Sequence, residues 1–271
     1  MSTDIHLAET SDTSPKVKPK PSKSKVPVPF AYYESDDGTD ENLLIILHGL
    51  GDTHSAFARM AKQLKLPQTA VLALRAPQQI PFMDMESFQW YPSFDPLGEL
   101  IPNPDPSPAL DLLTHVVEYL TSECAWAPYQ LHFFGFAQGG SVAAEFGHKW
   151  WRKHSSSSSE QIPNPSGRLG SIVTISGPLL SYPTITPLSP TPVLVVHRPP
   201  ANDPVFPKDA LVAYKKGFRE VREEVIGRGS QRQGMPASRE EWEPIMRFWS
   251  ERLGRRQGEG LYEVMAGAAK T

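Results

Sequence analysis

The sequence has a single cysteine, Cys124, among its 271 residues, which excludes an intrachain disulfide. It also lacks any apolar run near the roughly 20 residues that a membrane-spanning helix needs. No apolar core of a signal peptide lies near its start. We therefore expect a soluble, cytoplasmic protein without integral membrane association, with a nuclear location left open.

The chain also lacks a large net charge of either sign, since its formal net charge at pH 7 is only −3. Such a chain has no long-range field that would attract nucleic acid, so we expect no nucleic-acid partner. The histidines and Cys124 show no spacing typical of a metal site. We expect no metal and no cofactor, and the sequence leaves the oligomeric state open.

The ends of the chain differ in composition from its middle. Residues 1–26 combine Ser, Thr and Pro with a run of lysines and almost nothing apolar, which predicts a disordered tail. Residues 27–256 are long enough to bury one core and are predicted to form a single domain. Residues 257–271 are predicted to be a flexible tail.

Within this domain, short apolar runs alternate with amphipathic segments. Strands are expected at residues 43–47, 69–74, 130–134, 169–175 and 192–196. Helices are expected at 56–64, 107–120, 141–151, 207–224 and 240–253, and a long Pro-rich loop at 76–108. Buried strands that alternate with helices predict an α/β fold, with a doubly wound, mostly parallel sheet and helices on both faces.

A glycine-rich turn, Gly135-Phe136-Ala137-Gln138-Gly139-Gly140, lies between a predicted strand and a predicted helix. In a G-x-S-x-G nucleophile elbow, the glycines relieve crowding and the serine projects above the sheet. Here Ala137 takes the place of the serine, and a methyl group has no lone pair with which to attack a carbonyl. The pattern predicts a site shaped for ester chemistry without its nucleophile.

Four segments carry a family resemblance: residues 47–53, 135–140, 176–180 and 203–207. On them, residues 42–253 resemble the phospholipase/carboxylesterase family of α/β-hydrolases, which includes the acyl-protein thioesterases. The resemblance implies an oxyanion hole formed by the backbone N–H groups of Leu50 and Gln138. It implies that Asp203 is the acid of the catalytic triad. The residues that it implies around a substrate pocket are His48, Gly49, Phe88, Trp90 and Ser176.

The same resemblance places a histidine on the loop ahead of the last helix, where it would relay a proton. The sequence has no histidine after His197, and Arg198 stands where the family usually has the glycine of a His-Gly pair. Because nucleophile and base are both absent, we expect an inactive or severely impaired hydrolase. It would keep a pocket for a small acyl ester or an acylated protein.

Other hypotheses stay open. The protein could be an active ester or thioester hydrolase with a non-standard nucleophile such as Ser176. Cys124 lies in a helix-to-strand connection and is better explained as structural. Alternatively, the aromatic residues of segment 82–94 could dock a protein on an interaction scaffold. Residues 219–234 are unusually polar for the last core strand, so a gene-model error also stays open.

Overall fold

The computed structural model describes residues 17–81, 86–155, 167–183, 187–199, 206–207, 209–228 and 232–256. The tail predicted at 257–271 lies outside these residues, and so do residues 1–16 of the tail predicted at the start.

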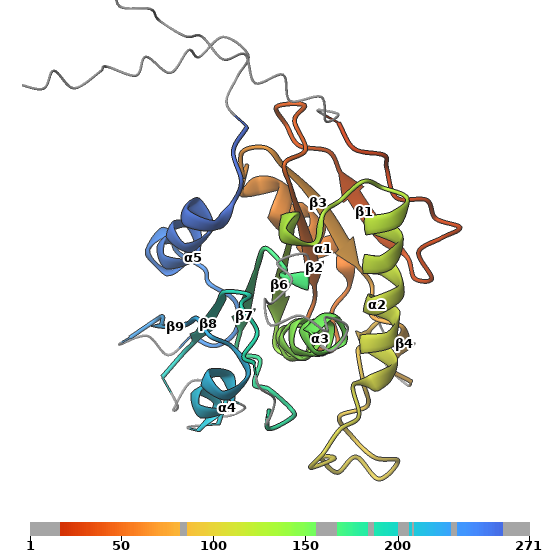
Figure 1. The fold of residues 1–271 in the computed structure, drawn as a ribbon. Helices are drawn as coiled ribbons and strands as arrows, with labels where there is room; N and C mark the ends of the chain where they lie inside the picture. Colours follow the sequence, from red (N-terminus) through yellow and green to blue (C-terminus); the bar gives the residue numbers. More distant parts are fainter. Residues whose placement is uncertain are drawn as a thin grey trace, which may run out of the picture.

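A seven-stranded sheet in the order β1-β3-β2-β6-β7-β8-β9 forms the centre of the molecule (Figure 1). Its strands are β1 (Phe30–Tyr33), β2 (Asn42–Leu47), β3 (Thr69–Leu74), β6 (Leu131–Phe136), β7 (Ser171–Ile175), β8 (Val193–His197) and β9 (Val221–Val225). Every neighbouring pair is parallel except β1 and β3. The short strands β4 (Gln78–Gln79) and β5 (Phe88–Gln89) pair separately.

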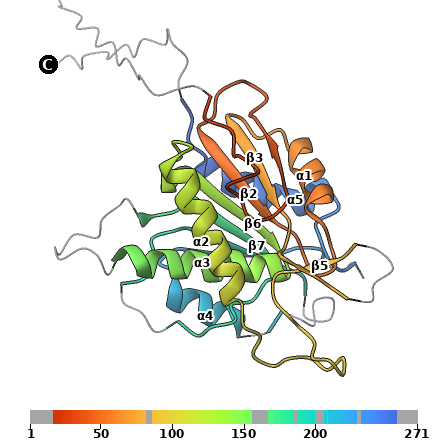
Figure 2. The same cartoon turned by 90° about the vertical axis from the view of Figure 1, so that its right-hand side faces the viewer.

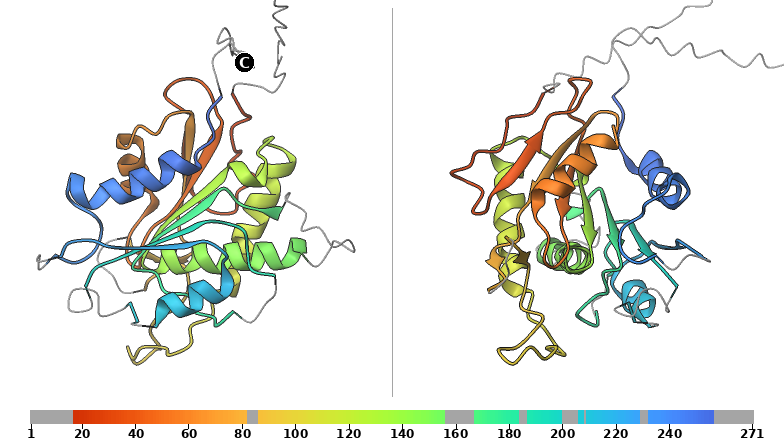
Figure 3. Two further views of the ribbon diagram at one scale, coloured as in Figure 1. Left: turned by 60° about the vertical axis from the view of Figure 1, so that its left-hand side comes forward. Right: turned by 180° about the vertical axis from the view of Figure 1, so that it is seen from behind.

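Helices cover both faces of this sheet. They are α1 (His54–Gln63), α2 (Ser107–Ser122), α3 (Gln138–Ser155), α4 (Ala210–Gly217) and α5 (Arg239–Arg252), with a 3-10 turn at Pro128–Gln130. Figure 2 looks onto the face covered by α2 and α3, and the left view of Figure 3 shows α5 across the other face. The predicted doubly wound, mostly parallel α/β fold is confirmed.

The central strand β2 shows why the sheet is buried on both sides. Successive side chains of a strand point to opposite faces. Leu43, Ile45 and Leu47 accordingly join the apolar core under α2, α3 and α4, whereas Leu44 and Ile46 join the core under α1 and α5. All six residues of β2 are buried, which is the reason that the strand reads as a continuous apolar run.

The helix predicted at 207–224 is wrong over much of its length. Helix α4 ends at Gly217, because Phe218 is extended with φ −128° and ψ 142°. Residues 221–225 form β9 instead, at the edge of the sheet, where its side chains are only partly buried. The polar stretch that raised the question of a gene-model error therefore contains an edge strand, which tolerates charged side chains.

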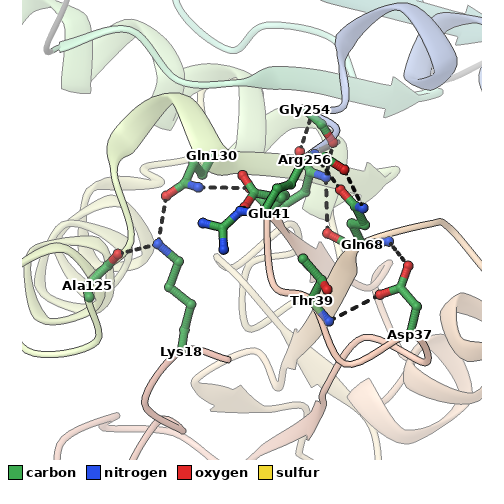
Figure 4. Close-up of polar contacts among 10 residues, drawn as sticks. Lys18, Asp37, Thr39, Glu41, Gln68, Ala125, Gln130, Gly254 and Arg256 are labelled. Carbon is green, nitrogen blue, oxygen red and sulfur yellow. Dashed lines mark hydrogen bonds and ion pairs between the residues drawn. The ribbon is translucent and has the colours of Figure 1, made fainter. Parts of the chain in front are cut away.

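The folded domain begins earlier than the predicted boundary at residue 27. Lys18 and Val26 are buried. The Lys18 ammonium donates to the oxygen of Ala125 over 2.7 Å and to Oε1 of Gln130 over 3.1 Å, as Figure 4 shows. It also lies 5.1 Å from the ring centre of Trp126. The prediction of a disordered tail is therefore wrong for residues 18–26.

Both ends of the described chain meet at the amino ends of the strands (Figure 4). Gln130 donates to the oxygen of Glu41 over 3.0 Å, and the Glu41 carboxylate pairs with Arg256 over 2.9 Å. Gln68 accepts from the Arg256 N–H over 2.7 Å. This network lies at the opposite end of the strands from the turn at Ala137.

Among the described helices, none is long and apolar enough to span a membrane.

Candidate functional site

Ala137 forms the apex of a tight turn between β6 and α3. Its backbone is left-handed, with φ 48°. The Ala137 N–H donates to the oxygen of Ile175 over 2.8 Å, and the Ala137 oxygen accepts from the N–H of Ser141 over 3.0 Å. A left-handed conformation is unfavourable for a residue with a Cβ atom and persists only where its surroundings enforce it. The strand, turn and helix therefore have the geometry of an elbow.

The glycines around Ala137 are required by close backbone approaches. A Cβ atom on Gly135 would lie 2.2 Å from the oxygen of Gly139, and one on Gly139 would lie 2.3 Å from the oxygen of Leu47. A Cβ atom on Gly140 would lie 2.4 Å from Oγ1 of Thr174. No side chain fits at such distances. The packing that an elbow needs is thus present around the methyl group.

The side chain of Gln138 ties this elbow to the aromatic segment. Its Oε1 accepts from the Trp90 N–H over 2.9 Å, and its amide donates to the oxygen of Tyr91 over 2.9 Å and to Oγ of Ser93 over 2.7 Å. The Trp90 indole N–H donates to the oxygen of His48 over 2.8 Å. The elbow, the aromatic segment and the turn after β2 therefore form one hydrogen-bonded unit.

The turn after β2 lies directly beside the elbow. A Cβ atom on Gly49 would lie 2.7 Å from Cδ1 of Phe136, and the Gly51 N–H donates to the oxygen of Phe88 over 2.9 Å. Within the described part of the chain, the backbone N–H groups of Leu50 and Gln138 have no hydrogen-bond acceptor. The structure thus brings together most of the residues implied by the family resemblance, with two N–H groups that have no acceptor among the described residues.

His48 is fully buried beneath this turn. Its Nε2 accepts from the Ala76 N–H over 2.9 Å, so that nitrogen carries no proton, and Nδ1 donates to the oxygen of Gly49 over 2.8 Å. Burial lowers the pKa of His48 to about 4. The ring is therefore neutral near pH 7, and both of its nitrogens are engaged, so it has no free nitrogen to act as a general base.

His197, at the end of β8, is engaged in a similar way. Its Nε2 lies 2.9 Å from the carboxylate of Glu223, its Nδ1 lies 2.9 Å from the oxygen of Arg198, and its ring stacks on Phe206 at 4.6 Å. Neither ring nitrogen is directed at the hydroxyl of a serine. Neither His48 nor His197 is therefore placed to take over from the missing late histidine.

The loop ahead of α5, where that histidine was expected, is held by Arg198. The buried guanidinium pairs with both carboxylate oxygens of Glu241, at 2.9 and 3.1 Å, and donates to the oxygens of Gly234 and Met235, each over 3.1 Å. A Cβ atom on Gly234 would lie 3.8 Å from Cζ of Phe136. The loop thus lies against the residue before Ala137.

Met235 is the residue that this loop contributes to the apolar cluster containing Phe136. A thioether there cannot accept a proton near pH 7 as an imidazole can. Sequence reasoning singled out the missing histidine but missed this arrangement. The one feature of the sequence that pointed to this arrangement was a charged residue, Arg198, in place of the glycine of the His-Gly pair.

The remaining candidates have different surroundings. Ser176 directly follows β7, has φ 54° and donates its N–H to the oxygen of Val196 over 2.8 Å. Asp203, the predicted acid, lies outside the described residues. Cys124 is buried, and burial raises the pKa of its thiol, which disfavours a nucleophilic role.

Across the described residues, no group of histidine, cysteine and carboxylate side chains is arranged to hold a metal ion.

Comparisons with known proteins bear on the family and the fold. The profile of the phospholipase/carboxylesterase family matches residues 31–209. A Mycosarcoma maydis protein described as an uncharacterized hydrolase is 34% identical over 223 residues, which is 82% of this chain and 80% of the relative.

Two solved structures share the fold. Esterase PE8 superposes with a TM-score of 0.63 at 18% identity, covering 83% of this chain and 99% of its own. Zea mays acyl-protein thioesterase 2 gives 0.61 at 20% identity, covering 84% and 100%. On the family profile and the Mycosarcoma relative, with a fold that agrees, the chain belongs to the phospholipase/carboxylesterase family of α/β-hydrolases.

Proposed function

We propose that this protein is a pseudo-hydrolase, which binds an acyl ester or the acyl group of an acylated protein at the elbow and does not cleave it. The observation that carries the proposal is Ala137, a methyl group at the apex of an elbow whose backbone conformation and close packing are those of an active one. Family membership supplies the substrate class.

The chemistry of the family explains what such a site retains. In an active hydrolase, serine attacks the carbonyl, histidine takes its proton, and two N–H groups stabilise the oxyanion. Here the N–H groups of Leu50 and Gln138 would still bind a carbonyl oxygen. Without nucleophile and base, hydrolases keep only about 10³–10⁴-fold acceleration over water, far below the usual enzymatic range.

Ser176 is the rival nucleophile. It lies at the carboxyl end of the neighbouring strand and has the same left-handed backbone as Ala137. A serine hydroxyl near pH 7 needs a base to become nucleophilic. The neighbouring ring, His197, has its nitrogens on Glu223 and Arg198. These contacts favour binding over turnover at Ser176.

The test uses the purified full-length chain. We expect turnover of p-nitrophenyl butyrate or of an acyl thioester to exceed the buffer rate by no more than about 10⁴-fold, far below an ordinary enzyme, and we expect no labelling by a fluorophosphonate. A short ester such as methyl octanoate should raise the melting temperature, since a ligand that binds only the folded state stabilises it.

Variants separate the alternatives. Turnover that persists in Cys124→Ala and is lost in Ser176→Ala would establish an active enzyme and refute the proposal. A pull-down partner that is lost in Trp90→Ala, while esters leave both the melting temperature and the pull-down unchanged, would instead favour an interaction scaffold.

A further inference from the structure

A cation without a counter-ion lies beside the elbow. Arg75 follows β3, and its guanidinium carbon lies 4.2 Å from the ring centre of Phe88. The Nε atom of Arg75 is buried and unpartnered, and among the described residues the side chain makes no ion pair. Buried polar groups in proteins are nearly always hydrogen-bonded, so a ligand that binds there would explain the unpartnered Nε of Arg75.

A second unpartnered nitrogen belongs to His54, the first residue of α1. Its Nδ1 is buried and has no hydrogen-bond partner in the described structure. His54 directly follows the turn whose Gly51 N–H is bonded to Phe88, the residue whose ring lies under Arg75. Burial, and then the charge of Arg75, lowers the pKa of His54. Thr53 gives the helix no side-chain cap, so the positive end of the α1 dipole lies at the same place.

Phe88 connects this pair to the elbow. Its oxygen accepts from Gly51, in the turn that carries Leu50, and its ring lies under the Arg75 guanidinium. The neighbour of Arg75, Ala76, donates its N–H to His48 at the start of the same turn. The cation, the aromatic ring and the turn beside Ala137 are therefore contiguous.

We propose that Arg75 and His54 form a carboxylate-binding site at the elbow, so that the site takes a free carboxylic acid as well as an acyl ester. This deepens the proposed function and rests on it. Arginine presents planar, paired N–H donors that match a carboxylate. A carboxylate is also a poor electrophile, so a site for an acid needs neither the serine nor the histidine that this chain lacks.

One acidic side chain lies near this site. Asp52 places Oδ2 3.2 Å from the position of a Cβ atom on Gly49, next to Phe136. It makes no ion pair with Arg75, which lies on the Phe88 side of the turn. Burial raises the pKa of Asp52.

The experiment measures binding of three eight-carbon probes by calorimetry: octanoate, methyl octanoate and octyl phosphate. We expect octanoate to bind the full-length chain at least about tenfold more tightly than its uncharged ester, as expected for a charge-assisted hydrogen bond. Arg75→Gln should remove this preference and leave the affinity for methyl octanoate unchanged. The matched control is Arg59→Gln, an exposed arginine of α1, which should change neither affinity.

The outcomes are distinguishable. Equal binding of acid and ester, unaffected by Arg75→Gln, would overturn the carboxylate site and leave the pseudo-hydrolase proposal standing. Hydrolysis of methyl octanoate would refute the pseudo-hydrolase. Tighter binding of octyl phosphate than of octanoate would assign the cation to phosphate, and absence of binding by all three probes would also overturn the inference. Arg75→Lys should keep part of the preference, which guards against a variant that merely misfolds.

Discussion

Ala137 and Ser176 directly follow neighbouring parallel strands and have the same left-handed backbone, at φ 48° and φ 54°. Each N–H donates over 2.8 Å to an oxygen of the next strand along, at Ile175 and Val196. Strained residues of this kind gather at functional sites, where the surrounding structure holds them. The carboxyl ends of these two strands therefore carry two left-handed turns, one bearing the methyl group of Ala137 and the other the hydroxyl group of Ser176.

Restoring the serine alone should not restore catalysis. In Ala137→Ser we expect no gain in kcat/KM for p-nitrophenyl butyrate and no fluorophosphonate labelling, because the nitrogens of His48 and His197 are already engaged and His54 belongs to the proposed carboxylate site. Labelling of the new serine in this single variant would show that some imidazole reaches the elbow after all.

Adding a base on the loop ahead of α5 should have a different result. The double variant Ala137→Ser, Met235→His puts an imidazole on the loop that lies against Phe136. General-base assistance contributes about 10²–10⁴-fold, so we expect turnover at least about 10² above that of either single variant. Equal rates in the single and double variants would mean that Met235 does not face the elbow.

The pair between Arg198 and Glu241 should be a large contributor to stability. Breaking a buried pair is costly, so Glu241→Gln should lower the free energy of unfolding by about 3–5 kcal/mol in urea titrations. The matched control is Glu243→Gln, which breaks the exposed pair with Arg247 and should cost at most about 1 kcal/mol. Similar losses in both variants would contradict this role.

Acid should destabilise the fold partly through His48. Its folded pKa of about 4 lies below that of an unfolded histidine, near 6.5, so the unfolded chain binds the proton first. The stabilisation is complete above pH 6.5 and is lost as the pH falls toward 4, by about 3 kcal/mol. Unfolding free energies at pH 7 and pH 4.5 test this, and His48→Gln should flatten the dependence. An NMR titration that protonates the ring above pH 6 would contradict it.

Lys18 should anchor the first described segment to the domain. Lys18→Met keeps the apolar stem and removes two hydrogen bonds and the contact with Trp126, at a cost of about 2 kcal/mol. For a domain of this size the melting temperature should fall by about 5 °C. Lys20→Met, at an exposed pair with Glu34, is the control and should melt like the parent protein.

The central strands were predictable because burial on both faces leaves a strong signal. Residues 69–74 read as an apolar run, and every one of them is buried in β3. The edge strands were not predictable. In β9 the sequence Val-Arg-Glu-Glu-Val has one neighbouring strand and partly exposed faces, so it was taken for the end of a helix. Strand β1, at the other edge, was missed for the same reason.

At the site, the place of the glycine-rich turn between a strand and a helix was enough to predict the elbow. The side-chain contacts around it could not be predicted. The elbow follows from glycines between a buried strand and a helix, and the structure has that geometry around Ala137. The pairing of Arg198 with Glu241, 43 residues away, depends on the tertiary fold and leaves no local pattern. Likewise, the lysine-rich run was predicted to be solvated, because nothing in the local sequence indicates that the carbonyl of Ala125, 107 residues later, lies beside Lys18.

The meeting of both described ends at the amino edge of the sheet has a practical consequence. A surface tether attached through either end would hold the molecule by the side on which Lys18 and Arg256 lie (Figure 4). The opposite rim, with Ala137 and Arg75, would then point into the solution. A sensor chip coated in this way would leave the proposed carboxylate site accessible to the analyte.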